Sequence, residues 1–458
     1  MKKFLWFLLI LLIHKIVAQN KQIGYDFAEL PQTLLLNPAS ETNYKFHIGL
    51  PLLSGFSTEI RSTGFVLSDV FAEDNRNIND KIATLISTVD ANDFLKINTQ
   101  IEVVSVGFRL NNKMYLSFGF YQELDAIGYF PKDFLVLFTE GNNQYINRNF
   151  SISQVNYKLD LFGVFHAGIS KKMNEKLTLG ARLKIYSSSI NFESKNNTGT
   201  FTTVEDSNNL YTHYFNNFNA TFRTSGFIDA NTNQYLEDPT EYVKNTFFGG
   251  NLGLGFDFGV TYHINSQLKF SASILDLGYI HHKKNIKNTR VAGNFVFEGT
   301  DFLFETADSA NDWDSIDERF EEDFPRGDNQ EAYISWRSTK INAALKYSFG
   351  QRRSKVCYDH RYKDFYTDAL GVQLFSVFRP LGPQLALTSF YEKSITDKIH
   401  TKFTYTIDEF SYTNIGAGLS AQLGKLNVYT MLDNILSYKN LSSANHVSLQ
   451  VGFNLIFE

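Results

Sequence analysis

The sequence predicts an all-β fold: a transmembrane antiparallel up-and-down β-barrel of about 14 strands. Three observations predict it. The chain begins with a leader-like segment, the rest lacks an apolar stretch long enough for a spanning helix, and long runs of alternating apolar and polar residues recur. Helices and closed barrels are the structures that satisfy every backbone group in lipid. An exported chain with these features therefore fits a barrel in the cell outer membrane.

The first residues have the layout of a signal peptide. Lys2 and Lys3 precede an apolar run, and the small residue Ala18 stands before Gln19. The run has about ten residues, too few to cross a bilayer as a helix, which needs about 20. We expect residues 1–18 to be a signal peptide. Residues 19–458 then form one barrel domain, including an N-terminal segment that leads into the barrel or plugs it.

Alternation with a period of two is the main signal, because successive strand side chains point to opposite faces. Residues 176–186 show it most clearly. The apolar residues there are assigned to the lipid face: Leu177, Leu179, Ala181, Leu183 and Ile185. The residues between them are assigned to the lumen, with Arg182, Lys184 and Tyr186 as candidate lumen-facing site residues. The closing residues 447–457 alternate in the same way, and Phe457 near the C-terminus resembles the assembly signal of outer-membrane barrels.

Strand length separates a barrel from the alternative of a soluble β-sandwich. Membrane strands need about 9–11 residues, whereas sandwich strands usually have about five or six. Several runs in this chain reach the membrane length, and the scarcity of cysteine excludes a disulfide framework, because Cys357 stands alone. The sandwich remains the soluble alternative.

Short and long connections alternate along the chain. Short turns are expected at 111–112, 171–175, 264–266, 394–397 and 423–424, and long loops at 123–152, 193–248 and 281–337. Short periplasmic turns and long external loops are the outer-membrane layout. Counting back from the last strand places the first full strand at 55–65, and counts of about 12 or about 16 strands also fit.

Two segments are harder to assign. Residues 44–50 are left as a lead-in segment lying partly inside the barrel. Residues 68–95 carry apolar side chains near helical spacing, which fits a helix that caps or plugs the barrel, or a partly ordered loop.

The sequence contains no recognisable enzyme motif. It contains neither a Gly-x-Ser-x-Gly nor a His-Glu-x-x-His motif, so we predict no enzyme and no cofactor. The net charge of −5 argues against a nucleic-acid partner. The acidic stretch 298–328 reads as a solvated external loop rather than a calcium site, because the EF-hand spacing is missing. His281 and His282 would point to opposite faces of a strand and chelate one metal poorly.

Three segments together resemble a known family. They contain Asn37-Pro38-Ala39, then Asp276-Leu277-Gly278 within 270–280 (preceded by 255–260), and Asp433-Asn434. The combination resembles the uncharacterised Bacteroidota outer-membrane barrels catalogued as a domain of unknown function, relatives of the PorP/SprF group. From the residues themselves, Pro38 restricts Asn37 to extended conformations. Asp276 and Asp433 are expected near strand ends, with carboxylates that accept from free backbone N–H groups.

The PorP/SprF group is linked to type IX secretion. The resemblance therefore implies a non-enzymatic interaction or anchoring platform, in contact with outer-membrane lipid and with a secreted surface protein or secretion-system component. The alternative is a transporter for a hydrophobic or small polar solute, with the N-terminal segment as a plug. A filled lumen favours the platform, and a continuous apolar cavity favours transport.

Overall fold

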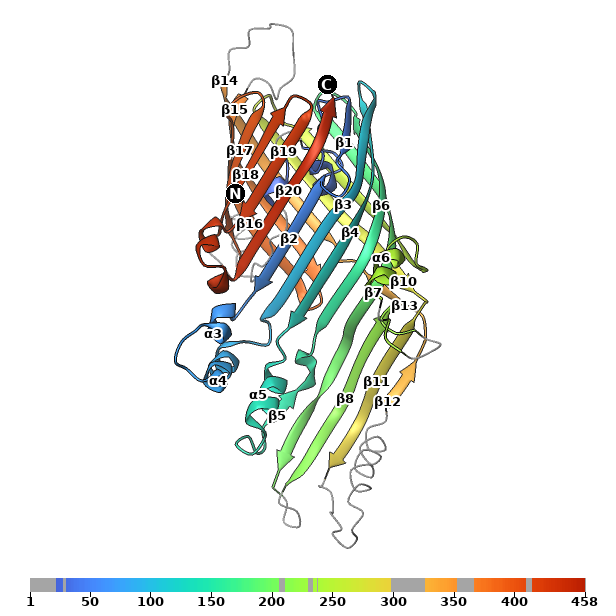
Figure 1. Cartoon of the computed structure of the whole chain (residues 1–458), viewed down its shortest axis with the longest axis vertical. Coiled ribbons are helices and arrows are strands. Elements are labelled where there is room, and N and C mark those ends of the chain that lie inside the picture. Colours follow the sequence, from blue (N-terminus) through green and yellow to red (C-terminus); the bar gives the residue numbers. More distant parts are fainter. Residues whose placement is uncertain are drawn as a thin grey trace, which may run out of the picture.

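The computed structural model describes residues 22–27, 30–205, 211–229, 234–236, 238–297, 326–351, 366–408 and 414–457. The expected signal peptide, Cys357 and most of the acidic stretch 298–328 lie outside these residues. The described part of the chain contains an antiparallel sheet that closes into a barrel of 14 strands, with further strands that extend beyond one rim (Figure 1). The predicted fold class and strand count are confirmed.

Each barrel strand is paired with the strands on both sides of it. The first half of the barrel comprises β1 (Phe46–Gly49) with β2 (Gly55–Ser62), β3 (Phe94–Asn111), β4 (Met114–Tyr129), β6 (Tyr157–Lys172), β7 (Leu177–Val204), β9 (Asn251–His263) and β10 (Leu268–His282). The second half comprises β13 (Tyr333–Trp336) with β14 (Lys340–Gln351), β15 (Tyr366–Arg379), β16 (Gly382–Ser394), β17 (Ile399–Ile407), β18 (Asn414–Leu423), β19 (Leu426–Asp433) and β20 (His446–Phe457). Closure is made by β20, which pairs with both β1 and β2.

The lead-in segment predicted at 44–50 is instead part of the wall. β1 pairs with β20 on one side and with β3 on the other, so β1 and β2 form one interrupted strand. The side chains of β1 alternate between the two faces of the wall, as in the other strands. His47 is buried, whereas Phe46 lies beside Phe457 of β20, with ring centroids 5.6 Å apart. The full strand expected at 55–65 ends earlier, at Ser62.

The two faces of the barrel differ sharply in polarity. On β9, Leu254, Phe256 and Phe258 are 44–50% exposed, while the intervening Asp257 is fully buried. An apolar outer band around a polar interior is the arrangement of an outer-membrane barrel. The protein is therefore located in the cell outer membrane. Within the described residues, no helix has the length and apolar character needed to cross a bilayer.

The predicted short turns all fall at one end of the barrel, the upper end in Figure 1, where the C-terminus also lies. At the other end β15 and β16 are joined by a tight turn, because Arg379 pairs directly with Gly382. The connection between β14 and β15 runs through 352–365, outside the described residues.

The three predicted long loops all contain regular β structure, most of it in 193–248 and 281–337. β7 continues far beyond the barrel rim to Val204, and its outer half pairs with β8 (Thr212–Ser225). β8 pairs in turn with β11 (Ile286–Phe297), which carries β12 (Arg326–Asn329). We call this four-stranded continuation the extension. Threonine and phenylalanine are frequent in β7 and β8, and both favour strands, so these segments pair instead of forming irregular loops.

Short helices and a short strand lie at the rim of the barrel or against its outside. They are α3 (Leu67–Phe71), α4 (Ile78–Thr88), α5 (Lys132–Glu140), β5 (Asn149–Ser151), η2 (Ile152–Gln154), α6 (Pro239–Asn245), η4 (Ile435–Lys439) and η5 (Leu441–Ser443). Residues 68–95 thus contribute two helices at the loop end and do not enter the lumen (Figure 1). Ile86 of α4 packs with Val136 of α5 and Phe150 of β5.

Candidate functional site

The N-terminal segment lies inside the barrel. The described residues of 22–44, which include η1 (Gln22–Gly24) and α2 (Thr33–Leu36), are here called the plug. Ile23, Phe27 and Leu30 form a buried cluster with Tyr429 and Met431 of β19. Apolar plug side chains therefore pack against inward side chains of the wall.

Cationic side chains from opposite sides of the wall hold the plug backbone. The Arg182 guanidinium of β7 donates to the carbonyl of Leu34 and, at 3.3 Å, to that of Leu35. Across the lumen, Nζ of Lys402 donates to the carbonyl of Tyr25 at 2.7 Å. Buried carbonyls need donors, and bonds from charged donors are stronger than neutral ones. The plug is thus bound on two sides.

The Asn37-Pro38-Ala39 triplet sits on a glycine pair in the wall. Oδ1 of Asn37 accepts from the backbone N–H of Ala39 at 2.9 Å, which closes a tight turn. Gly180 of β7 and Gly259 of β9 are directly paired. A Cβ at Gly180 would lie 2.1 Å from the carbonyl carbon of Pro38, and a Cβ at Gly259 would lie 2.1 Å from Oδ1 of Asn37. The triplet therefore requires glycine at both wall positions.

Asp257 and Asp276 are the centre of a buried ion cluster. Oδ2 of Asp257 lies 2.9 Å from Nη1 of Arg182 and 2.9 Å from Nζ of Lys184. Asp276 accepts from Lys184 at 2.6 Å and from Lys340 at 3.0 Å. All five side chains point into the lumen, where each charge has a partner of opposite sign, as buried charges require.

Asp276 is not near a strand end, contrary to expectation. It lies within β10 at a β-bulge, where the pairing with β9 shifts between Ile274 and Leu277, and its φ of 60° is left-handed. The Asp276 carboxylate accepts from side chains, Lys184, Lys340 and the Tyr186 hydroxyl at 3.1 Å, rather than from free backbone groups. A bulge re-aims a side chain, and here it turns a carboxylate into the lumen.

The neighbours of Asp276 have separate places in the wall. Leu277 is 42% exposed on the outer face. At Gly278 a Cβ would lie 2.4 Å from the Leu254 carbonyl oxygen and 2.9 Å from the Tyr186 ring. Tyr186 itself is fully buried, so Gly278 makes room for the ring beside the cluster.

Asp433 and Asn434 make their contacts elsewhere. Asp433 ends β19, as predicted, but its carboxylate accepts from the Ser448 hydroxyl at 3.3 Å. Asn434 has a φ of 53° and starts the turn into η4. Its amide donates to the carbonyl of His446 at 2.9 Å, and its backbone N–H donates to Oδ1 of Asn414 at 2.8 Å. This pair fixes the end of a strand.

Further ion pairs line the lumen and were not singled out in the sequence. They are Arg379–Asp125 (2.7 Å), Arg61–Asp408 (2.8 Å), Arg337–Asp160 (3.0 Å), Lys96–Glu59 (3.0 Å), Lys402–Glu392 (3.1 Å) and Lys269–Asp26 (2.6 Å). The signal that finds the strand members of these pairs is a charge at an inward position of an alternating run. Sequence separation hides the pairing itself.

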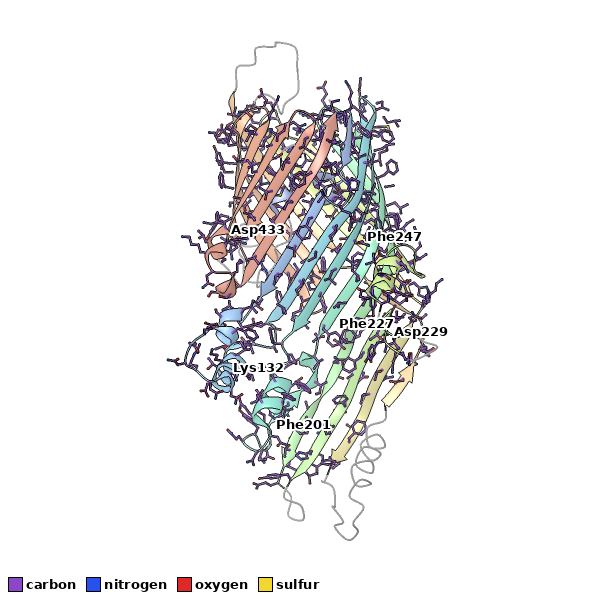
Figure 2. The ribbon with its side chains drawn as sticks, viewed as in Figure 1. Lys132, Phe201, Phe227, Asp229, Phe247 and Asp433 are labelled. Atoms are coloured by element: carbon purple, nitrogen blue, oxygen red, sulfur yellow. The ribbon has the colours of Figure 1, made fainter. Side chains whose placement is uncertain are left out.

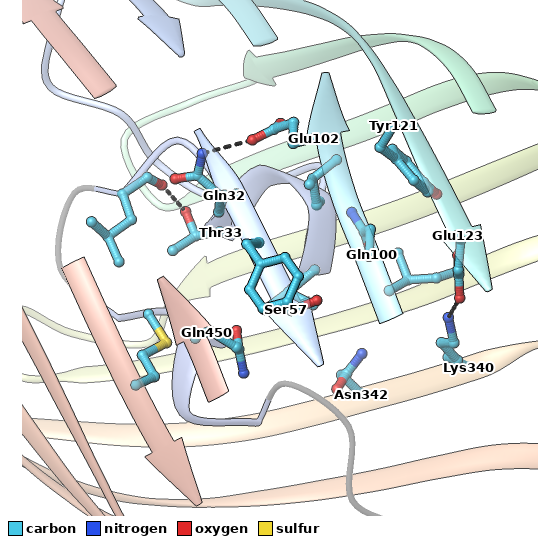
Figure 3. A pocket seen from close by; sticks show the side chains of 18 of the residues that line it. Gln32, Thr33, Ser57, Gln100, Glu102, Tyr121, Glu123, Lys340, Asn342 and Gln450 are labelled. Atoms are coloured by element: carbon cyan, nitrogen blue, oxygen red, sulfur yellow. Dashed lines mark hydrogen bonds and ion pairs between the residues drawn. The ribbon is translucent and has the colours of Figure 1, made fainter. Parts of the chain in front are cut away.

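A cavity lies between the plug and the wall. Figure 3 shows this cavity, in which Gln32 of the plug donates to Glu102 at 2.9 Å and Glu123 lies 3.9 Å from Lys340. Its volume is about 70 Å³. That holds a few water molecules, whereas pockets for organic ligands measure about 300–1,000 Å³.

His281 and His282, the last two residues of β10, point to opposite faces of the strand, as expected. His282 is buried and lies 2.8 Å from the Ser335 hydroxyl, whereas His281 is exposed on the outer face. Across the described ranges, no group of three or more His, Cys, Asp or Glu side chains is placed to hold a metal ion.

Similarity to solved structures is distant. A FadL homologue of Pseudomonas aeruginosa has 9% identity and a TM-score of 0.42, with 97% of this chain and 100% of that chain covered. The toluene transporter TodX of Pseudomonas putida has 8% identity and a TM-score of 0.38, covering 97% and 98%. The translocator domain of the Neisseria meningitidis autotransporter NalP has 7% identity and a TM-score of 0.33, covering 92% and 91%.

No curated protein matches the chain. A family model described as a family of unknown function (DUF5723) matches residues 38–433. The match begins at Pro38 in the glycine-seated triplet and ends at Asp433, the last residue of β19, so it spans the plug contact and nearly the whole wall. The protein therefore belongs to the DUF5723 family.

Proposed function

We propose that this protein is a non-enzymatic outer-membrane platform that holds a protein partner at its external face. The plug inside the lumen is the observation that carries the proposal. The plug is bound by Arg182 on one side and by Lys402 on the other, and the cavity beside it has a volume of about 70 Å³. A barrel filled in this way offers surface for binding rather than a path for solutes.

The external end supplies that surface. Phe134 and Phe138, one turn apart on α5, are 52% and 83% exposed, and Leu67 and Phe71 of α3 are 56% and 73% exposed. Exposed apolar side chains that cluster on a surface favour a protein contact. The extension reaches farther out beside these helices (Figure 2).

The identity of the partner is inferred from the resemblance of the sequence segments to the PorP/SprF group. We propose a secreted surface protein or a component of the type IX secretion system. No nucleic acid and no cofactor enters this function.

Conductance in planar bilayers tests whether the lumen is closed. The wild type should show no steady conductance. Gly180→Val should open a pore, because the new side chain displaces Pro38. Gly128→Val is the control, since a Cβ at Gly128 meets nothing within 4 Å. A steady wild-type conductance, or solute uptake in a liposome-swelling assay, would overturn the platform and favour the transporter.

Photo-crosslinking in the native cells tests partner binding. A crosslinking residue in place of Phe138 should capture an exported protein. The same residue in place of Leu254, which faces lipid, should capture none. Absence of a protein crosslink at position 138, and at position 71 on α3, would contradict the platform.

A further inference from the structure

The connection between β8 and β9 folds back over the outside of the barrel. α6 and the turn after it (residues 246–250) lie against β4, β6 and β7. Phe162 and Val164 of β6 point into the lumen, so Gly163 between them faces outward. A Cβ at Gly163 would lie 2.2 Å from the carbonyl oxygen of Thr246. The segment therefore touches the wall on its lipid side, where Phe247 is seen in Figure 2.

Polar contacts explain why it returns to the wall. Gln122 and Ser187 are outward neighbours of Gly163 on β4 and β7. The amide of Gln122 donates to Oγ1 of Thr246 at 2.8 Å, and the hydroxyl of Ser187 donates to the carbonyl of Asn245 at 2.8 Å. The segment satisfies two polar side chains that lipid alone would leave unpaired.

The outer side of the same segment is apolar. Phe247 stacks near Phe120 with centroids 4.6 Å apart, and Phe248 stacks on Phe165 at 4.4 Å. Even so, Phe247 remains 47% exposed, Phe248 54% and Val243 53%. These side chains continue the apolar lipid face of the wall outward.

Cations flank these side chains. Lys244 is exposed in the last turn of α6, four residues before Phe248 in the chain, and Nζ of Lys284 lies 3.4 Å from the Gly249 carbonyl oxygen. The exposed acid Glu241 also lies on α6. Exposed charges are not accommodated in the hydrocarbon core, whereas exposed aromatic side chains favour lipid. A segment that carries both lies at the boundary between acyl chains and headgroups.

We propose that residues 239–250 and Lys284 form a lipid clamp on the outside of the barrel. Phe247 and Phe248 enter the acyl region of the external leaflet, and Lys244 and Lys284 bind the phosphate group of an anionic lipid. Charge complementarity selects this occupant, because an apolar surface edged by ammonium groups matches a phosphate attached to acyl chains. The clamp fixes the height of the external rim in the membrane.

Spin labels measure the depth of the segment. Phe247→Cys and the two references are made in a Cys357→Ser background and reconstituted in lipid bilayers. The label at 247 should show the high oxygen and low aqueous-reagent accessibility of Leu254→Cys on the wall. Val296→Cys, on the extension, serves as the aqueous reference. Accessibility at 247 equal to that at 296 overturns the proposal.

Native mass spectrometry measures the headgroup preference. Phosphatidylglycerol titrated into the detergent-solubilised protein should bind the Lys244→Gln/Lys284→Gln variant roughly 10- to 30-fold more weakly than wild type. Lys132→Gln/Arg290→Gln removes two charges from α5 and β11 and should leave binding unchanged. Equal binding by both variants, or displacement by millimolar inorganic phosphate alone, refutes a lipid-phosphate site.

Discussion

Arg182 shows how much one residue does inside this barrel. Its guanidinium neutralises Asp257 at 2.9 Å and caps the carbonyls of Leu34 and Leu35 in the plug. Without it, Asp257 keeps one cation, Lys184, which Asp276 also shares, and a hydrogen bond from the Asp276 backbone N–H at 2.7 Å. Removing one partner of a buried ion pair leaves an uncompensated charge, which is costly.

We expect Arg182→Met to lower the free energy of unfolding by about 3–5 kcal/mol. Urea titration in detergent, read as the heat-modifiable gel mobility of the folded barrel, measures it. Arg76→Met is the control, because the Arg76 and Asp74 side chains lie 2.8 Å apart and are 52% and 35% exposed. Such a pair contributes about 0–1 kcal/mol. Equal losses in the two variants would show that Arg182 does not hold the plug.

At the scale of elements, β7 displays what sequence predicts well. Its barrel half has Leu179 and Leu183 outside, at 42% and 44% exposure, and Thr178 buried inside. Alternation is local, so the faces and the short turns could be predicted. The outer half of β7 could not, because an alternating run does not say where the membrane ends.

The contacts between residues far apart in the chain could not be predicted from the sequence. Arg182 and Asp257 are 75 residues apart, and the plug residue Gln32 bonds Asn454 at a separation of 422. The Asp276 bulge needs the register of β9 against β10, which no local pattern supplies. The sequence shows the Asn37-Pro38-Ala39 motif, but Gly180 and Gly259, against which it packs, come together only when β7 and β9 pair.

Charges on the two faces of β7 should have different effects. Leu183→Arg, in the membrane part of the strand, should cost about 2–4 kcal/mol, because an arginine there faces the hydrocarbon. Thr178→Arg should be milder, since the Thr178 hydroxyl is 3.4 Å from the Glu41 carboxylate, which can pair with the new charge. The yield of heat-modifiable barrel in the outer-membrane fraction measures both. Equal damage would contradict the assignment of the faces.

The whole molecule divides into a closed ring and an open extension. Barrel strands are paired on both sides, whereas the extension is joined to the barrel by the pairing of β8 with the outer half of β7. Residues 200–204 of β7 pair with β8, and Phe201 supports the cluster of Ile86, Val136 and Phe150 from α4, α5 and β5. The external helices therefore pack against the extension, whereas β6 and β9 pair with the other half of β7.

Shortening the extension should separate these two parts. Thr198 and Asn219 are directly paired, so replacing residues 199–218 by an Asn-Gly turn closes a shorter hairpin without shifting register. Membrane insertion and heat-modifiable mobility should persist, because every barrel pairing remains. Protease sensitivity within α4 and α5 should rise and the crosslink at Phe138 should be lost, because the support at Phe201 is gone. Phe201→Ala should reproduce the protease sensitivity in the full-length sheet, whereas loss of insertion in the shortened variant would mean that the extension is needed to build the barrel.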